Sequence, residues 1–305
     1  MKMIKIKSKK HKGTEGDLFT KRSGGEKAVF VVAFIFLLVY SISLVIPTLW
    51  MLLNSFKDGT EYALDVVGAS THRLPEKWLF SNYLDVYQDI KIDNVSFLEM
   101  FANSAYFIVA GALQLYWQAA VAYVMAKYEF KANKYIYAIA IFCMTLPIMG
   151  NTAASLKLNA SLGIYDNLLA PIITAGAGAF GFNFLMLYGF FKNVSSEYME
   201  AASIDGASHF AIFWHVMLPQ AMPMLSTFFI LHAISSWSDY STPMLYFPSH
   251  PNVAYGLYLV SNELTRGDMP SYFAALVLSA LPVLILFALC SDRIMKNYSI
   301  GGLKG

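Results

Sequence analysis

The sequence is poor in charge and in cysteine. Only 14% of its 305 residues are Asp, Glu, Lys or Arg, against roughly 25% in an average soluble domain. The two cysteines, Cys143 and Cys290, lie inside apolar runs and form neither a metal-ligand spacing nor a disulfide framework. A net charge of +2 is too small to indicate a nucleic-acid partner. The composition therefore excludes a disordered chain, a disulfide-rich secreted module and an ordinary cytosolic enzyme.

Long apolar runs are what the sequence has instead, and 57% of the residues are hydrophobic. A helix needs about 20 apolar residues to cross the hydrocarbon layer of a membrane. The sequence therefore predicts an all-α membrane protein, because a membrane barrel would show short alternating segments. The six predicted transmembrane helices span about 28–53, 103–126, 135–156, 167–191, 219–241 and 270–293.

The basic residues predict the orientation, because Lys and Arg in short loops prefer the cytoplasm. If the N-terminus is inside, sixteen basic residues lie in cytoplasmic segments and six on the other side. Nine of the sixteen belong to the tail 1–27. The loop 54–100, predicted outside, has eight acidic and four basic residues. Both termini are therefore predicted to be cytoplasmic, with the first helix as an uncleaved anchor and residues 28–305 as one transmembrane domain.

The loop 192–218, between the fourth and fifth predicted spans, predicts a helix–turn–helix on the cytoplasmic face. A pair of serines can cap the start of the first helix. Gly206 ends that helix, because glycine readily adopts the left-handed conformation. Ser208 caps a second short helix, which Pro219 limits.

The same loop resembles a known signature. Glu200-Ala201-Ala202, followed by Gly206 and by Val216-Met217-Leu218-Pro219, is similar to the EAA motif of permease subunits of bacterial ATP-binding-cassette importers. The family usually has isoleucine where Val216 stands. The neighbouring Ile204-Asp205-Gly206-Ala207 resembles the carbohydrate branch, the maltose-permease type. Weaker matches to that branch occur at Asn82-Tyr83, Asn103-Ser104, Ala122-Tyr123, Trp237-Ser238-Asp239, Leu281-Pro282 and Gly302-Leu303-Lys304-Gly305.

This resemblance implies a non-catalytic subunit of the bacterial inner membrane that forms the path for a sugar or oligosaccharide. It implies as partners two ATPase subunits, which carry ATP and Mg, a second permease subunit, for which family precedent favours a distinct chain, and an extracytoplasmic solute-binding protein. The chain itself is expected to bind no cofactor and no metal, and it contains no G-x-x-x-x-G-K-[ST] phosphate loop. The residues implied in ATPase coupling are Glu200, Ala201, Ala202, Asp205, Gly206, Leu218 and Pro219.

A polar stripe in the fifth predicted span suggests a substrate path. His232, Ser236 and Asp239 follow one another at i, i+4 and i+7, and therefore share one helix face. Polar residues within a membrane usually face the bundle interior or a water-filled cavity. Trp237 and Tyr240 flank the stripe as further candidates. Two plainer interpretations remain: Asp239 lies at the outer membrane interface, and His232 is a packing residue.

Three alternative functions stay open at this point. The first is a permease of the same architecture for another solute, such as an amino acid, a polyamine or glycerol phosphate. The second is an intramembrane enzyme, which would need paired carboxylates, an H-E-x-x-H motif or a buried serine with a base. The third is a secondary transporter, which usually shows inverted repeats and intramembrane charges. The sequence shows neither set of features.

Overall fold

The computed structural model describes residues 24–68, 74–145, 151–263 and 268–300. The predicted basic tail therefore lies almost wholly outside the described residues, as does Gly302-Leu303-Lys304-Gly305. The chain divides into two units, 1–51 and 52–305, which are described separately. The first consists of most of helix α1 (Gly24–Asn54), which contains Pro47. The second is a helical bundle with one short β-hairpin.

Four helical runs in the described residues are long and apolar enough to cross a membrane. They are Lys27–Asn54 in α1, Phe97–Lys127 (α4), His209–Ser238, which ends with α11 (Leu218–Ser238), and Met269–Cys290 in α14 (Met269–Ile300). These runs match the first, second, fifth and sixth predicted spans. Each forms a helix because it has the length and apolar character that a bilayer requires.

The fourth predicted span, 167–191, is bent rather than straight. It consists of α7 (Ala170–Thr174), the 3₁₀ turn η1 (Ala175–Gly178) and α8 (Phe182–Asn193). The two halves meet at 54°, and they count as a fifth candidate span only if taken together. Gly181 precedes α8 with an extended backbone, which interrupts the helix.

The third predicted span, 135–156, is not one described helix. It falls on α5 (Asn133–Thr145) and α6 (Thr152–Ser161), and residues 146–150 between them lie outside the description. These helices have 13 and 10 residues, fewer than the roughly 20 that a crossing needs. The described residues therefore account for four or five spans, and the sixth stays a prediction.

The predicted outside loop, 54–100, is folded. It contains α2 (Gly59–Val66), α3 (Ser81–Asp89) and a hairpin of β1 (Lys91–Ile92) and β2 (Val95–Ser96). The hairpin leads into α4 through a capping box, in which the Ser96 N–H donates to Glu99 at 2.7 Å. This box starts α4 six residues before the predicted start of the second span, at 103.

Asn82 bonds to the start of this loop, just after the last residue of α1. Its buried side-chain amide donates to the carbonyls of Ser55, at 2.8 Å, and Lys57, at 2.9 Å. Tyr83 shares a hydrogen bond of 2.7 Å with the Ser55 hydroxyl. The buried Lys57 ammonium pairs with Asp65 of α2. The Asn82-Tyr83 pair therefore has a structural role, because it satisfies backbone carbonyls that would otherwise be buried without a partner.

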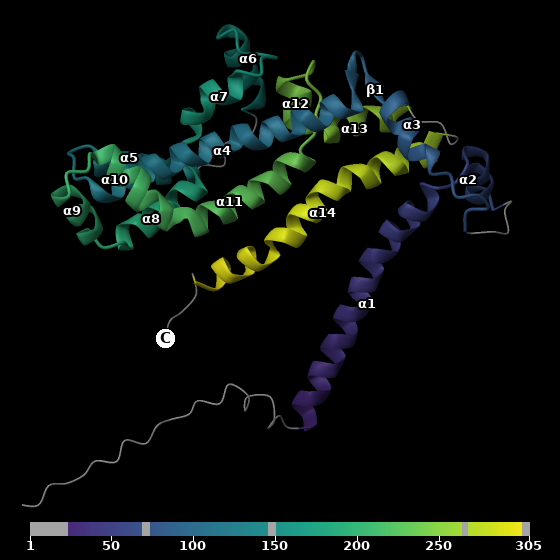
Figure 1. Cartoon of the computed structure of the whole chain (residues 1–305), viewed down its shortest axis with the longest axis horizontal. Coiled ribbons are helices and arrows are strands. Elements are labelled where there is room, and N and C mark those ends of the chain that lie inside the picture. The colour runs from purple at the N-terminus through teal and green to yellow at the C-terminus, as the bar shows by residue number, and fades with distance from the viewer. Residues whose placement is uncertain (1–23, 69–73, 146–150, 264–267, 301–305) are drawn as a thin grey trace, which may run out of the picture. The chain divides into compact units, whose positions relative to one another are not determined.

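Helix α4 is at the centre of the bundle and packs against α8, α11 and α13 (Figure 1). Its Asn103 side chain donates to the Pro251 carbonyl at 3.0 Å, and its Ser104 hydroxyl accepts from the Val253 N–H at 3.0 Å. These bonds attach α4 to α13 (Val253–Glu263), which sequence reasoning did not predict. Helix α12 (Ser241–Tyr246), between α11 and α13, was not predicted either.

Candidate functional site

The first half of the loop with the EAA motif is helix α9 (Glu197–Ile204). The Ser195 hydroxyl accepts from the Glu197 N–H at 3.3 Å, whereas Ser196, which directly precedes α9, makes no side-chain capping bond. At the other end Gly206 has φ +82°, and the Ala207 N–H donates to the Ala202 carbonyl at 3.0 Å. Together with the bond from Gly206 to Ser203, this is a Schellman motif. The predicted turn at Gly206 is present for the predicted reason.

The second half of the loop differs from the prediction. Ser208 caps α10 (His209–Ile212) as expected, by accepting from the Ala211 N–H at 3.3 Å. The helix does not end at Pro219, however, but passes through a π-helical segment, η2 (Phe213–Met217), into α11. Pro219 lies in the first turn of α11, directly after this wider segment. Its missing N–H is tolerated there, so the helical run of the fifth span begins at His209 rather than at 219.

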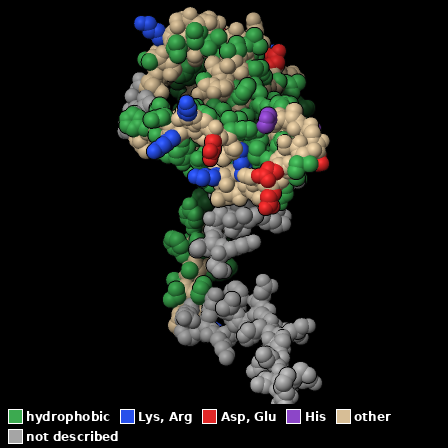
Figure 2. Space-filling view, turned by 90° about the vertical axis from the view of Figure 1, so that its left-hand side faces the viewer, with side chains coloured by type: hydrophobic (Ala, Val, Ile, Leu, Met, Phe, Trp, Pro, Cys, Tyr) green, Lys and Arg blue, Asp and Glu red, His purple; other side chains and the backbone are tan. Residues whose placement is uncertain are grey.

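Most of the predicted coupling residues are accessible. Glu200, Ala201, Asp205 and Gly206 are exposed, as is Pro219, while Ala202 and Leu218 are half-buried against the core. Ile204, which sequence reasoning missed, is 87% exposed at the end of α9. Figure 2 views the end of the molecule that carries α9 and α10, and shows acidic and basic side chains among hydrophobic ones.

The C-terminal end of α4 holds this loop in place. The Lys127 ammonium donates to the Val194 carbonyl, which lies between α8 and α9. The Tyr128 hydroxyl and His209 Nδ1 are 2.9 Å apart, and the buried Tyr123 hydroxyl approaches the Met199 sulfur at 3.9 Å. The loop is thus attached to α4 before α9, within α9 and at the start of α10. These contacts place the Ala122-Tyr123 pair of the sequence pattern beside the loop.

Three of the predicted substrate-path residues, His232, Ser236 and Asp239, line one cavity of about 490 Å³. Its wall comes from α4, α6, the α7–η1 half of the bent span, α11 and α12. The remaining lining residues are Phe107, Ala110, Gly111, Gln114, Asn159, Ala170, Pro171, Thr174, Ala175, Gly178, Ser235, Thr242, Pro243, Phe247 and Asn252. We call this space the polar cavity.

Asp239 also has a structural role at the edge of the polar cavity. Its Oδ1 accepts from the N–H groups of Ser241, at 2.9 Å, and Thr242, at 3.1 Å, and so caps the start of α12. Its backbone carbonyl accepts from the Asn252 side chain at 2.8 Å. The carboxylate is therefore held in place. Within the described residues, no three His, Cys, Asp or Glu side chains lie close enough to hold a metal ion.

His232 packs against α4 through Gly111. A Cβ at Gly111 would lie 1.8 Å from the Nε2 of His232, so only glycine leaves room for the ring. The Nε2 atom is buried and has no hydrogen-bond partner among the described residues. The ring therefore contributes to helix packing and to the cavity wall together, which combines the two interpretations that the sequence left open.

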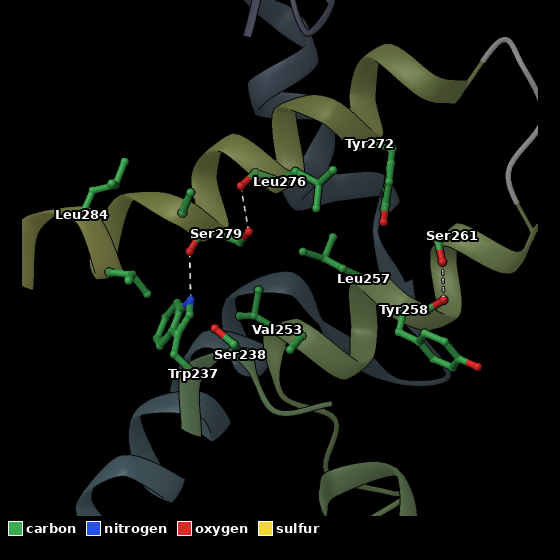
Figure 3. A pocket seen from close by; sticks show the side chains of 13 residues that line it. Trp237, Ser238, Val253, Leu257, Tyr258, Ser261, Tyr272, Leu276, Ser279 and Leu284 are labelled. Atoms are coloured by element: carbon green, nitrogen blue, oxygen red, sulfur yellow. Dashed lines mark hydrogen bonds between the residues drawn. The ribbon is translucent and has the colours of Figure 1, made fainter. Parts of the chain in front are cut away.

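Trp237 and Tyr240 lie away from the polar cavity. The Trp237 Nε1 donates to the Ser279 carbonyl of α14 at 2.9 Å. Its ring helps line a second, more apolar cavity of about 500 Å³ between α11, α13 and α14 (Figure 3). Tyr240 stacks on Tyr258 of α13, with the ring centroids 4.7 Å apart. Three of the five candidates therefore line the polar cavity, and Trp237 and Tyr240 do not.

Two glutamines of α4 stabilise the bend in the fourth span, and sequence reasoning missed them. The side-chain amides of Gln114 and Gln118 both donate to the Gly178 carbonyl, at 3.3 and 2.9 Å. A broken helix inside a membrane needs such partners, because no lipid group can bond the freed carbonyl. Their i, i+4 spacing in an apolar run was the available signal.

A family model matches residues 118–299, which is more than half of the chain and includes α8 to α13 and the cavity face of α11. The model describes the binding-protein-dependent transport system inner membrane component. The chain belongs to this family. Members are non-catalytic permease subunits of ATP-binding-cassette importers, and ATP hydrolysis takes place in partner subunits. Membership implies an ATPase and a solute-binding protein as partners.

Individual relatives of this permease match over nearly their whole length. The diacetylchitobiose uptake system permease protein NgcG of Streptomyces coelicolor is 28% identical over 273 residues, covering 87% of this chain and 86% of NgcG. The probable ABC transporter permease protein YurM of Bacillus subtilis is 26% identical, covering 92% and 89%. A solved bacterial ABC transporter that imports the acidic polysaccharide alginate has a chain of the same fold, with TM-score 0.71, 23% identity and coverage of 89% and 98%.

Proposed function

We propose that this permease forms the translocation path for a sugar or oligosaccharide in an ATP-driven importer of the bacterial inner membrane. The observation that carries the proposal is the polar cavity beside α11, in a family member whose relatives include a diacetylchitobiose permease. The importer contains two ATPase subunits, which bind ATP and Mg, a second and distinct permease subunit, and an extracytoplasmic solute-binding protein. The chain has six spans and both termini in the cytoplasm.

Coupling to the ATPase occurs through α9 and the turn that follows it. Glu200 and Asp205 offer exposed carboxylates, and Ile204 offers an exposed apolar side chain beside them. Such a surface suits a cleft with an apolar floor and a basic rim, because a charge-assisted contact adds to apolar burial. Ala201 and Gly206 keep the surface low enough for another backbone to approach, while Ala202, Leu218 and Pro219 connect the loop to the bundle.

The polar cavity supplies the substrate-path residues His232, Ser236 and Asp239. Small-molecule sites are concave and apolar, with a few polar groups that fix orientation. The polar cavity has that character, since aromatic and aliphatic residues surround its hydroxyl, amide and imidazole groups. Trp237 and Tyr240 contact α14 and α13 instead, outside the polar cavity.

The test is ATP-dependent uptake by the purified complex in proteoliposomes. We expect an ATPase to copurify with this chain, and a labelled glycan to accumulate only with ATP and the solute-binding protein. Uptake driven by a proton gradient in the chain alone would contradict the proposal and favour a secondary transporter. ATP-dependent uptake of an amino acid or a polyamine, with no glycan transported, would retain the architecture and refute the sugar assignment.

A further inference from the structure

Among the described residues, the charged lining of the polar cavity is acidic and has no basic counterpart. Asp239 is its single charged lining residue within the described part of the chain, and no Lys or Arg lines it there. The nearest lysine in sequence to the wall, Lys157 of α6, is exposed and lies two residues from the lining residue Asn159. The bonds from the backbone to Asp239 hold its carboxylate at the wall rather than leaving it free to swing away.

The uncharged groups of the same wall are available to a ligand. Asn159, Ser235, Ser236 and Thr242 line the cavity. In the part of the chain that the structure describes, their side chains make no hydrogen bond. Hydroxyl and amide groups both donate and accept. They therefore suit the hydroxyl and N-acetyl groups of a glycan, which also donate and accept.

We propose, on the basis of the function proposed above, that this permease passes uncharged glycans and rejects uronic acids. A uronate brings a carboxylate toward Asp239 with no basic residue of this wall to pair with it. Two carboxylates inside one cavity repel each other, and the repulsion is stronger where protein rather than water surrounds them. An uncharged glycan meets only the hydroxyl and amide groups. The cavity wall thus selects uncharged glycans over uronates in two ways: it repels the uronate carboxylate, and it forms hydrogen bonds with the hydroxyl and amide groups of the glycan.

The first experiment measures the charge preference of the cavity directly. In the assembled complex, with Cys143→Ser and Cys290→Ser, a Ser236→Cys variant reacts with a cationic and an anionic methanethiosulfonate reagent of similar size. Positions 236 and 239 lie one helical turn apart, with Cβ atoms about 5–6 Å from each other. The ratio of cationic to anionic rates should therefore fall by up to about tenfold when Asp239→Asn is added.

Asp239→Asn is suitable because asparagine also caps helices and keeps the side-chain oxygen that α12 uses. The matched control is Asp166→Asn, which removes a carboxylate outside the polar cavity whose oxygen also accepts a backbone N–H, from Ser249 at 3.1 Å. The control should leave the rate ratio unchanged. An equal ratio with and without Asp239 would overturn the proposal, as would failure of both Ser235→Cys and Ser236→Cys to react.

The second experiment compares substrates in the reconstituted importer. The probes are diacetylchitobiose, cellobiose and arabinobiose, against digalacturonate and dimannuronate. We expect flux of at least one neutral glycan, and a several-fold higher ratio of uronate to neutral flux in Asp239→Asn. The wild type and the Asp239→Asn variant are assayed with the same solute-binding protein. The preference of that protein therefore cancels when their ratios of uronate to neutral flux are compared. Uronate flux equal to neutral flux in the wild type refutes the inference alone, whereas no glycan flux at all refutes the proposed function.

Discussion

Replacement of Gly206 separates two reasons why a glycine stands in the coupling loop. The first reason is conformation, because Gly206 has φ +82° and ends α9 in a Schellman motif. The second applies if the proposed coupling role holds, and it is close approach of the ATPase to the exposed backbone at Gly206. A Cβ added at Gly206 would meet no atom of this chain within 4 Å, so a clash inside the chain is not a third reason.

The conformational cost follows from the backbone alone. An L-residue other than Gly or Asn in the left-handed region costs about 1–2 kcal/mol. Because about 1.4 kcal/mol corresponds to a tenfold change, Gly206→Ala should lower the population of the bent loop by about 5- to 30-fold relative to alternatives. If the ATPase binds only the bent loop, its apparent affinity falls by the same factor. Gly206→Asn should cost less, because asparagine tolerates this conformation.

The assay is ATPase affinity for the purified permease pair, measured with wild type, Gly206→Ala, Gly206→Asn and Gly206→Val. If conformation dominates, affinity falls in the order Asn, Ala, Val, with the asparagine variant close to wild type. If close approach dominates, Ala is tolerated better than Asn, because size now decides. All three variants should still insert, since the turn lies outside the predicted spans. Wild-type affinity and uptake in the Val variant would refute both reasons and the coupling role of this turn.

Three further outcomes are expected. Glu200→Lys should abolish stimulation of the ATPase by the loaded binding protein, because it places a cation opposite an ATPase surface that is expected to be basic. Glu197→Lys on the same helix should reduce this stimulation less, and an equal reduction by both variants would count against the Glu200 contact. Asn82→Ala should destabilise the loop 54–100 by about 1–3 kcal/mol and lower the Tm of the complex, while Asn94→Ala at the exposed hairpin turn should not. Ile204→Ser should weaken ATPase binding with no change in Tm, and unaltered binding would remove this exposed side chain from the docking surface.

The parts of the fold that sequence reasoning predicted depend on local chemistry. The runs that form α1, α4, α11 and α14 are long and apolar. In a bilayer such a run satisfies its own backbone groups only as a helix. The turn at Gly206 and the cap at Ser208 also need only neighbours within a few residues. The alignment of His232, Ser236 and Asp239 follows from helix periodicity, and the three do line one cavity.

The parts that it missed depend on distant partners or on helix geometry that was not applied. The bend before α8 has its carbonyl satisfied by Gln114 and Gln118, which lie 64 and 60 positions away from Gly178. Continuation of the helix through Pro219 required the π segment, which has no clear signal in composition. The direction of Trp237 was predictable, however. Adjacent residues on a helix point about 100° apart, so a residue next to Ser236 faces another side.

Helix α4 connects the two proposed functional regions, the EAA loop and the polar cavity. It has 31 residues and no internal proline, so it extends over about 46 Å. One end grips the EAA loop through Tyr123, Lys127 and Tyr128, and its middle forms part of the polar cavity through Gly111 and Gln114. The helix that contacts the EAA loop therefore also forms part of the wall of the polar cavity. If the proposed coupling holds, one uninterrupted helix connects the ATPase-facing loop with the wall of the solute path.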